Sequence, residues 1–334
     1  MLTLKIMTSS NISRVALLAL LWSNAACLSK EQLVPVKPQG AEQIASVELG
    51  EDYKWQVYYS LENNKEIARN LITDWDLAFE CGTAGYRITL NSAKFRMGVY
   101  PVYGKDFSAV SAKDSSGIKL RTDLYTGLLD STAIGDWRSD KPVFIVNRGV
   151  DADGKNTGTC KIQVLESDAA SYTVRVSGLD NSNDTLLTVE KNDRYTFTQV
   201  SLGNGAAVLH AEPPAKDWDI VFTKYTHFYT DLNMPYAVVG CLLNRYSTFA
   251  AVDTMHTDFS SITLQSAENV SFSSLINTIG FEWKSYDINA GLYTVDSKKY
   301  YLIKVQSGAY YKMRFTGFYK NGLKGAPEWQ FQRL

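Results

Sequence analysis

Trp75-Asp76-Leu77-Ala78-Phe79 is the stretch that decides the fold, because it returns as Trp218-Asp219-Ile220-Val221-Phe222, 143 residues later (218 − 75). Ile134-Gly135-Asp136-Trp137 likewise returns as Ile279-Gly280-Phe281-Glu282-Trp283, 145 residues later (279 − 134). Ser60-Leu61 answers to Ser201-Leu202 in the same order. The chain therefore reads as a duplication, with a period far longer than the roughly 20–50 residues of solenoid repeats.

Two tandem domains are expected from this repeat, at 46–182 and 183–334. Each is close to the usual size of a domain. The polar turn residues 180–184 predict the linker between them. Within each unit, Trp75 or Trp218 is expected to pack in a core, and Asp76 or Asp219 to accept hydrogen bonds from the backbone.

Alternating apolar and polar residues predict strands in both units. The apolar residues Cys160, Ile162 and Val164 in the first unit, and Tyr311, Met313 and Phe315 in the second, recur with the period of two that puts them on one buried face. Segments 144–146 and 301–303 precede turn signals and predict an antiparallel hairpin near the end of each unit. The predicted fold class is mainly β, with one short helix allowed over 64–70.

Composition narrows the classes of function. The chain has 334 residues, of which 45% are hydrophobic and 21% charged, and its formal net charge is -1. This composition is that of a globular protein and disfavours nucleic acid as a partner. The sequence contains no P-loop, Gly-x-Ser-x-Gly or His-Glu-x-x-His motif. No enzyme is predicted, and a hydrolase of unknown type has no positive signal.

The amino-terminal segment 1–26 has the features of a secretory signal peptide. Its apolar run, 15–22, is shorter than the ~20 residues that span a bilayer. Ala25-Ala26-Cys27 resembles a bacterial lipobox, so Cys27 is expected to carry lipid and 27–45 to form a polar linker. The alternative is ordinary signal cleavage with Cys27 as a bystander, since Asn24 replaces the usual Leu. The expected location is the outer membrane or cell surface of a Gram-negative bacterium.

The remaining cysteines are Cys81, Cys160 and Cys241, and none belongs to a Cys-x-x-Cys pair. An odd number allows at most one internal disulfide, and Cys81 with Cys160 is the pair to test. The alternative is that all three are small buried residues.

The Trp-Asp strand, the Ile-Gly-x-x-Trp turn and the closing stretch 310–319 together resemble the HmuY family of haem-binding surface lipoproteins. Unit 183–334 matches better than unit 46–182, which is the more divergent copy. The resemblance implies an all-β domain on a lipid anchor, capture of haem from haemoproteins, and delivery to an outer-membrane receptor. It also implies axial ligation of the haem iron by two His, or by Met in some relatives.

The candidate haem-binding residues lie in the second unit, because 46–182 contains no His and only one Met, Met97. His256 lies between the two repeat anchors, where the resemblance places a ligand, and Met255 is beside it. His256 and His227 are the candidate iron ligands, and Met255 is a further haem-binding candidate. Neighbours in a strand face opposite sides, so at most one of Met255 and His256 faces a given pocket.

His227 follows the second Trp-Asp strand. If that strand continues, His227 shares a face with Val221 and Tyr225, opposite Trp218 and Ile220. The third histidine, His210, is expected in a loop. For each histidine the alternative is a solvated or hydrogen-bonded surface role.

Two other readings of function stay open. A binding or adhesion lipoprotein that keeps the fold without haem is favoured by the His-free first unit. Its ligand would be a glycan, a peptide or a protein, because the 20 Tyr and 7 Trp are suitable contact residues. The hydrolase is the third reading.

Overall fold

The computed structural model describes residues 39–203 and 205–334, which form a mainly β structure and confirm the predicted fold class. Every pairing between the named strands of these residues is antiparallel. The predicted signal peptide, Cys27 and the linker as far as residue 38 lie outside the described residues.

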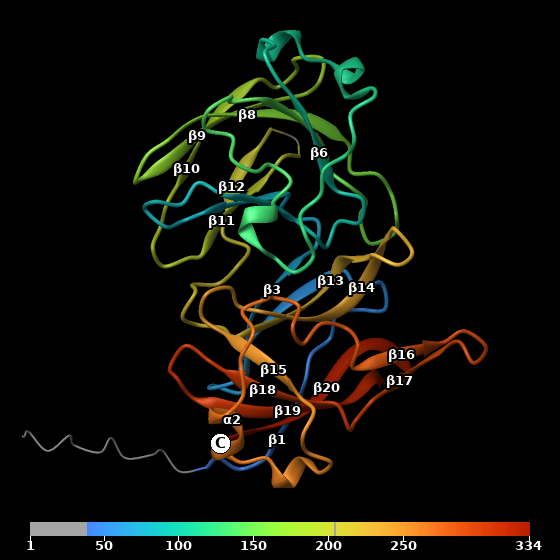
Figure 1. The fold of residues 1–334 in the computed structure, drawn as a ribbon. Helices are drawn as coiled ribbons and strands as arrows, with labels where there is room; N and C mark the ends of the chain where they lie inside the picture. The colour runs from blue at the N-terminus through green and yellow to red at the C-terminus, as the bar shows by residue number, and fades with distance from the viewer. Residues whose placement is uncertain (1–38, 204) are drawn as a thin grey trace, which may run out of the picture. The chain divides into compact units, whose positions relative to one another are not determined.

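Two five-stranded sheets hold the main cores (Figure 1). The first has the order β1 (Gln43–Ser46), β20 (Leu323–Arg333), β19 (Tyr310–Lys320), β18 (Tyr300–Lys304) and β15 (Phe249–Asp253). The second has the order β10 (Thr185–Glu190), β9 (Ser171–Ser177), β8 (Thr159–Ser167), β7 (Val143–Asn147) and β6 (Gly98–Val102).

Two four-stranded sheets contain the Trp-Asp strands. One has the order β12 (Ala207–Leu209), β11 (Phe197–Ser201), β4 (Leu77–Glu80) and β5 (Ile88–Leu90). The other has the order β14 (Met234–Leu243), β13 (Ile220–Tyr229), β2 (Trp55–Ser60) and β3 (Lys65–Leu71). A separate hairpin joins β16 (Lys284–Asp287) to β17 (Leu292–Val295). The helical segments are short: η1 (Phe107–Ala109), η2 (Ala112–Ser115), η3 (Leu129–Ser131), η4 (Phe259–Ser261) and α2 (Leu264–Glu268).

Strands from the two predicted units pair with each other in both four-stranded sheets. The hairpin β2–β3 of the first unit pairs with β13 of the second, in the register Ile220 with Tyr59. The hairpin β11–β12 of the second unit pairs with β4 of the first, in the register Thr198 with Phe79. Residues 180–184, predicted as a linker, form the turn between the paired strands β9 and β10. The bounds 46–182 and 183–334 therefore stay a prediction about the sequence repeat, and strand pairing crosses them.

The predicted terminal hairpins are confirmed as β7–β8 and β18–β19. The opposite faces of β8 and β19 are also covered by the protein, however. Lys161 on β8 is fully buried and donates from Nζ to the carbonyl of Val110 at 2.8 Å. Lys312 on β19 does the same to the carbonyl of Phe259 at 2.9 Å. These hydrogen bonds hold the loops that contain Val110 and Phe259 against the two strands. The carbonyl groups replace the water that each ammonium group loses on burial.

Two local predictions are settled by packing. The helix allowed over 64–70 is wrong, because these residues form β3 and pair with β2. Its half-buried Ile67 and Ala68 pack beside Tyr58 and Trp218, and this tertiary contact overrides the helical propensity of a short charged segment. Cys81, Cys160 and Cys241 are all free and buried, so the alternative of small buried residues is confirmed and the Cys81–Cys160 disulfide is absent.

Candidate binding site

The Trp-Asp strands are fixed by matching hydrogen bonds. Asp76 accepts the backbone N–H of Leu202 at 2.6 Å, and Asp219 accepts that of Leu61 at 2.7 Å. The predicted role of both carboxylates is confirmed. Asn91 and Asn244 support them equally, because each donates its side-chain amide to the carbonyl of the tryptophan before the aspartate, at 2.9 Å for Asn91 and 2.7 Å for Asn244.

The two aspartates differ in their other partners. Asp76 also pairs with Lys94 and with Arg148, whose guanidinium lies 3.1 Å away, and both Asp76 and Lys94 are fully buried. Asp219 has no basic partner among the described residues, and burial raises its pKa to about 6. The first carboxylate therefore has two basic partners, whereas backbone donors stabilise the second.

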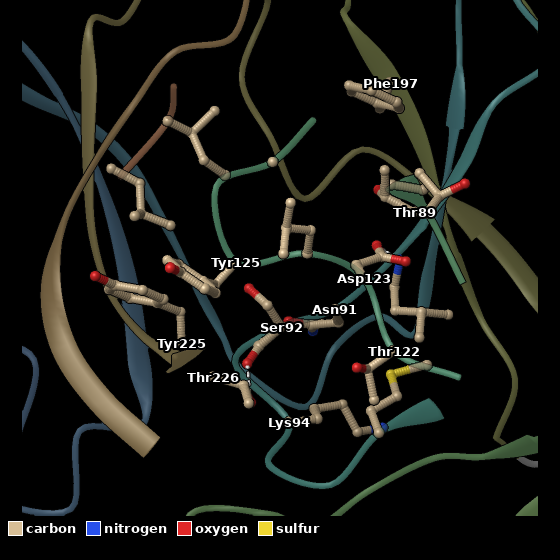
Figure 2. Close-up of a pocket in the computed structure, with 18 of the residues that line it drawn as sticks. Thr89, Asn91, Ser92, Lys94, Thr122, Asp123, Tyr125, Phe197, Tyr225 and Thr226 are labelled. Atoms are coloured by element: carbon tan, nitrogen blue, oxygen red, sulfur yellow. Dashed lines mark hydrogen bonds between the residues drawn. The ribbon is translucent and has the colours of Figure 1, made fainter. Parts of the chain in front are cut away.

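A cavity of about 450 Å³ opens between the two four-stranded sheets. Figure 2 shows Tyr125 and Tyr225 beside each other on one side of it, with Thr89 and Phe197 on the other. The cavity is open on one side, so solvent or a ligand can enter it, and its volume is that of small-molecule pockets.

The walls are mostly aromatic and aliphatic. They come from β2, β4, β5, β11, β13 and β14 and from the loops near 91–97 and 120–132, and include Tyr58, Trp75, Leu90, Met97, Leu124, Leu128, Phe197, Trp218, Val221, Leu242 and Ile276. Thr226 of β13 donates to the carbonyl of Ser92 at 3.0 Å and fixes one loop against the sheet (Figure 2).

Trp75 and Trp218, which were expected only to pack in a core, both line this cavity. Trp75 donates its indole N–H to Gln56 at 2.8 Å. Trp218 is 5% exposed and stacks edge-on against Tyr58, but its indole Nε1 has no partner among the described residues. Trp218 also lies with Val221 and Tyr225 rather than opposite them, because it precedes β13 and does not follow the alternation of the strand.

Besides the tyrosines, five ionisable side chains line the cavity: Lys94, Arg96, Asp123, Glu212 and Arg245. Burial raises the pKa of Glu212 to about 8, against the opposing charge of Arg245. Its one side-chain partner is Gln199, whose Nε2 donates at 3.4 Å. Burial also raises the pKa of Asp123 to about 6, although the backbone N–H groups of Leu90 and Ala133 donate to it at 2.7 Å.

Arg245 is one of three basic side chains that line the cavity, with Lys94 and Arg96. It donates to the carbonyl of Gly127, and its guanidinium lies 5.5 Å from the ring centre of Phe197. Burial lowers its pKa, while Glu212 and Asp123 oppose that shift. An arginine stays protonated at neutral pH. The cavity thus combines an apolar wall with a fixed positive charge and two carboxyl groups of raised pKa.

His227 lies near the end of β13, one residue beyond the cavity wall. Its ring centre is 4.2 Å from that of Tyr125, 4.8 Å from Tyr229 and 5.1 Å from Phe281. Its Nδ1 is buried without a partner among the described residues. Burial lowers the pKa of His227, so its imidazole is neutral at neutral pH.

His256 and Met255 lie elsewhere, in the loop that follows β15. Both ring nitrogens of His256 are engaged, Nδ1 with Asp253 at 2.8 Å and Nε2 with Ser266 at 3.3 Å. Met255 is 81% exposed. His256 and His227 contact different residues, and neither is among the described residues that line the cavity.

His210 follows β12 in a loop, as predicted, and stacks on Tyr195 with 4.1 Å between the ring centres. It is exposed. Neither His210 nor His256 is therefore held as His227 is, half-buried among aromatic rings with a free nitrogen.

Comparison with known proteins decides the family. The model of the HmuY protein family matches residues 52–331, which is most of the chain. The chain belongs to the HmuY family. The match runs through the boundary expected at 182/183 and so takes in both predicted units.

Two solved structures are similar to this chain. The apo HmuY analog from Tannerella forsythia has 10% identity and a TM-score of 0.34, with 90% of this chain and 98% of that chain covered. Apo PinO from Porphyromonas gingivitis has 10% identity and a TM-score of 0.35, with 88% and 97% covered. No curated protein matches.

Sequence reasoning missed the polar residues of the cavity in this HmuY-family protein, namely Asp123, Glu212 and Arg245. None belongs to a recognisable motif, and Glu212 precedes Pro213-Pro214 in a stretch that reads as a loop. No spacing marks them, because strands and loops far apart in the chain bring them together. Within the described residues, no group of three or more metal-ligating side chains occurs and no helix is long and apolar enough to cross a membrane.

Proposed function

We propose that this HmuY-family protein binds haem, with His227 as an axial ligand of the iron. The observation that carries the proposal is the surroundings of His227. A neutral imidazole with a free, desolvated nitrogen stands among three aromatic rings, 4.2–5.1 Å away between ring centres. Axial ligation requires a neutral imidazole, and a porphyrin requires an apolar surface.

The aromatic surface continues across the β13–β14 hairpin. Tyr236 lies opposite His227 and Met234 opposite Tyr229 in the strand register, so all four side chains share one face. Tyr236 is 55% exposed and Met234 is 44% exposed. Exposed apolar residues gathered on one face are typical of a binding surface. Bound haem would supply a Lewis-acidic iron there, and this chain would supply the imidazole nitrogen and the apolar contacts.

The cellular role is part of the same proposal. The protein would be an exported lipoprotein, anchored through Cys27 in the outer membrane or at the cell surface. It would take haem from haemoproteins and pass it to an outer-membrane receptor. Membership of the HmuY family supports this role.

A haemin titration of the purified protein, followed by absorbance in the oxidised and reduced states, tests the proposal. A Soret shift that saturates at one equivalent is expected, and His227→Ala should abolish its low-spin bands. His210→Ala is the matched control, because its ring is exposed and outside the aromatic cluster. A non-saturating change in the unmodified protein would contradict haem binding.

Variants of the other two predicted haem-binding residues are tested by the same titration. His256→Ala and Met255→Ala should leave the Soret band in place, since His256 already has a partner at each ring nitrogen. If His256→Ala removed the low-spin bands and His227→Ala did not, the iron ligand would be in the loop after β15.

A binding role without haem is the second candidate. The apolar cavity favours it, because no histidine lies among the described residues that line it and its polar groups suit an organic ligand. A haemin titration without saturation, combined with tight binding of a glycan, peptide or protein, would support this role.

A further inference from the structure

Trp218 lines the cavity between the two four-stranded sheets and has an unused hydrogen-bond donor. Trp218 is 5% exposed, and its Nε1–H has no partner among the described residues. A buried indole N–H nearly always has one, and an unpaired donor is costly. An indole nitrogen can only donate, so the missing partner is an acceptor.

Two other polar side chains that line the same cavity can also donate. Arg245 uses one nitrogen on the carbonyl of Gly127, which leaves further N–H groups of its guanidinium. Glu212 is protonated at neutral pH because its pKa is about 8. A protonated carboxyl group donates through its O–H. The cavity therefore offers donors and the cations Lys94, Arg96 and Arg245, beside the carboxyl group of Asp123 with its pKa of about 6, while most of its wall is apolar.

We propose that this cavity binds a small amphipathic carboxylic acid, with its carboxylate at Arg245 and Trp218 and its apolar body against Tyr58 and Phe197. A carboxylate supplies the acceptors that these donors lack and pairs with a guanidinium in a charge-assisted hydrogen bond. The positive charge of Arg245 would repel an organic cation. The volume of about 450 Å³ suits a medium-length chain or a ring system.

The site is separate from the proposed iron ligand. The ring of Tyr125 lines the cavity and stands between it and His227, with 4.2 Å between the two ring centres. Binding of the carboxylic acid therefore does not depend on haem binding, and each proposal can fail alone.

Calorimetric titration of the whole protein with decanoate tests the site, with decanol and decylammonium as probes of equal length. Decanoate should bind at one equivalent, and both other probes at least about tenfold more weakly, because each lacks the charge-assisted pair with Arg245. Equal binding of decanol, or no binding of decanoate, would overturn the proposal.

Three variants locate the contact. Arg245→Gln should weaken decanoate binding about tenfold or more, whereas Arg138→Gln, at an exposed arginine paired with Asp136, should not change it. Trp218→Phe removes the N–H and keeps an aromatic ring, and a loss of about threefold or more is expected. An unchanged affinity in both cavity variants would place decanoate elsewhere and overturn the proposal.

The affinity for decanoate should also depend on pH. Glu212 faces Arg245, Tyr58 and Cys81, and burial raises the pKa of the phenol and of the thiol, so both stay neutral near pH 8. Ionisation of Glu212 as the pH rises through about 8 would repel the carboxylate and weaken binding. Glu212→Gln should remove this dependence, and a dependence that persists in the variant would overturn the role of Glu212.

Haemin separates the two proposals. His227→Ala should keep decanoate binding, and Arg245→Gln should keep the Soret band. If haemin displaced decanoate and Arg245→Gln lost both ligands, the cavity would be the haem site and the proposal of a second ligand would be overturned.

Discussion

The carboxylate of Asp76 accepts the backbone N–H of Leu202 at 2.6 Å, across 126 residues of sequence. Asp219 accepts the N–H of Leu61 at 2.7 Å, across 158 residues. Each Trp-Asp strand is thus tied to the Ser-Leu segment of the other predicted unit. The same sequence element makes the same contact twice, and both contacts join the two halves of the chain.

Replacing the two aspartates should have unequal effects on stability. Asp76→Asn leaves the fully buried Lys94 without its counter-charge, and loss of one partner of a buried pair costs about 3–5 kcal/mol. Asp219→Asn keeps an oxygen acceptor for Leu61 and removes no ion pair, so about 1–2 kcal/mol is expected. Urea unfolding measures both, and an equal or larger loss in Asp219→Asn would contradict the asymmetry.

Stability should fall as the pH rises above about 4, in part because of Glu212. Its folded pKa of about 8 lies above the ordinary value near 4.3, so the folded state binds more protons between these values. The stabilisation is fully present below pH ~4 and is lost by pH ~8. Between pH 5 and pH 8, the free energy of unfolding of Glu212→Gln should therefore rise relative to that of the unmodified protein by on the order of 2–3 kcal/mol. Urea unfolding at both pH values measures the gain, and parallel curves would contradict it.

If His227 ligates the haem iron as proposed, the affinity for haem should fall as the pH falls, whereas the stability contributed by Glu212 falls as the pH rises. Burial lowers the pKa of His227 below its ordinary value of 6.5, so the imidazole stays neutral to a lower pH than a solvated one. Protons compete with iron only below that range, and affinity should therefore fall as the solution becomes acidic. Haemin titrations from pH 7.5 to pH 5 measure this fall. An affinity that rises on acidification would exclude His227 as the ligand.

The three internal thiols should be unreactive in the native protein. Cys241 is fully buried, and burial raises the pKa of Cys160 to about 12 and also raises that of Cys81. The thiolate is the reactive form, so labelling by a thiol reagent should be slow until urea unfolds the chain. Mass spectrometry of labelled protein counts the modified cysteines. Rapid native labelling of Cys160 would show that β8 opens to solvent.

The local β structure of the chain could be predicted from sequence, because it rests on short-range patterns. The apolar alternation of Cys160, Ile162 and Val164 predicted the buried face of β8 correctly, and Asn321-Gly322 forms the two-residue turn between β19 and β20. Both turn residues have positive φ, 52° and 80°, as the type I′ geometry requires. The helix allowed over 64–70 was wrong because this segment forms a strand that pairs with β2. Ile67 also packs beside Tyr58 and Trp218, a contact that the local sequence does not show.

The sequence by itself determined the repeat, the β-rich class, the family resemblance and the restriction of histidine to residues 183–334. The tertiary structure alone shows that the Trp-Asp strands pair across the two predicted units, that both tryptophans line a cavity, and that Arg245 and Glu212 line it as well. Periodicity and repeated motifs depend on neighbouring residues and are visible in one dimension. A cavity depends on which distant strands pair, and that choice follows from the packing of the whole chain.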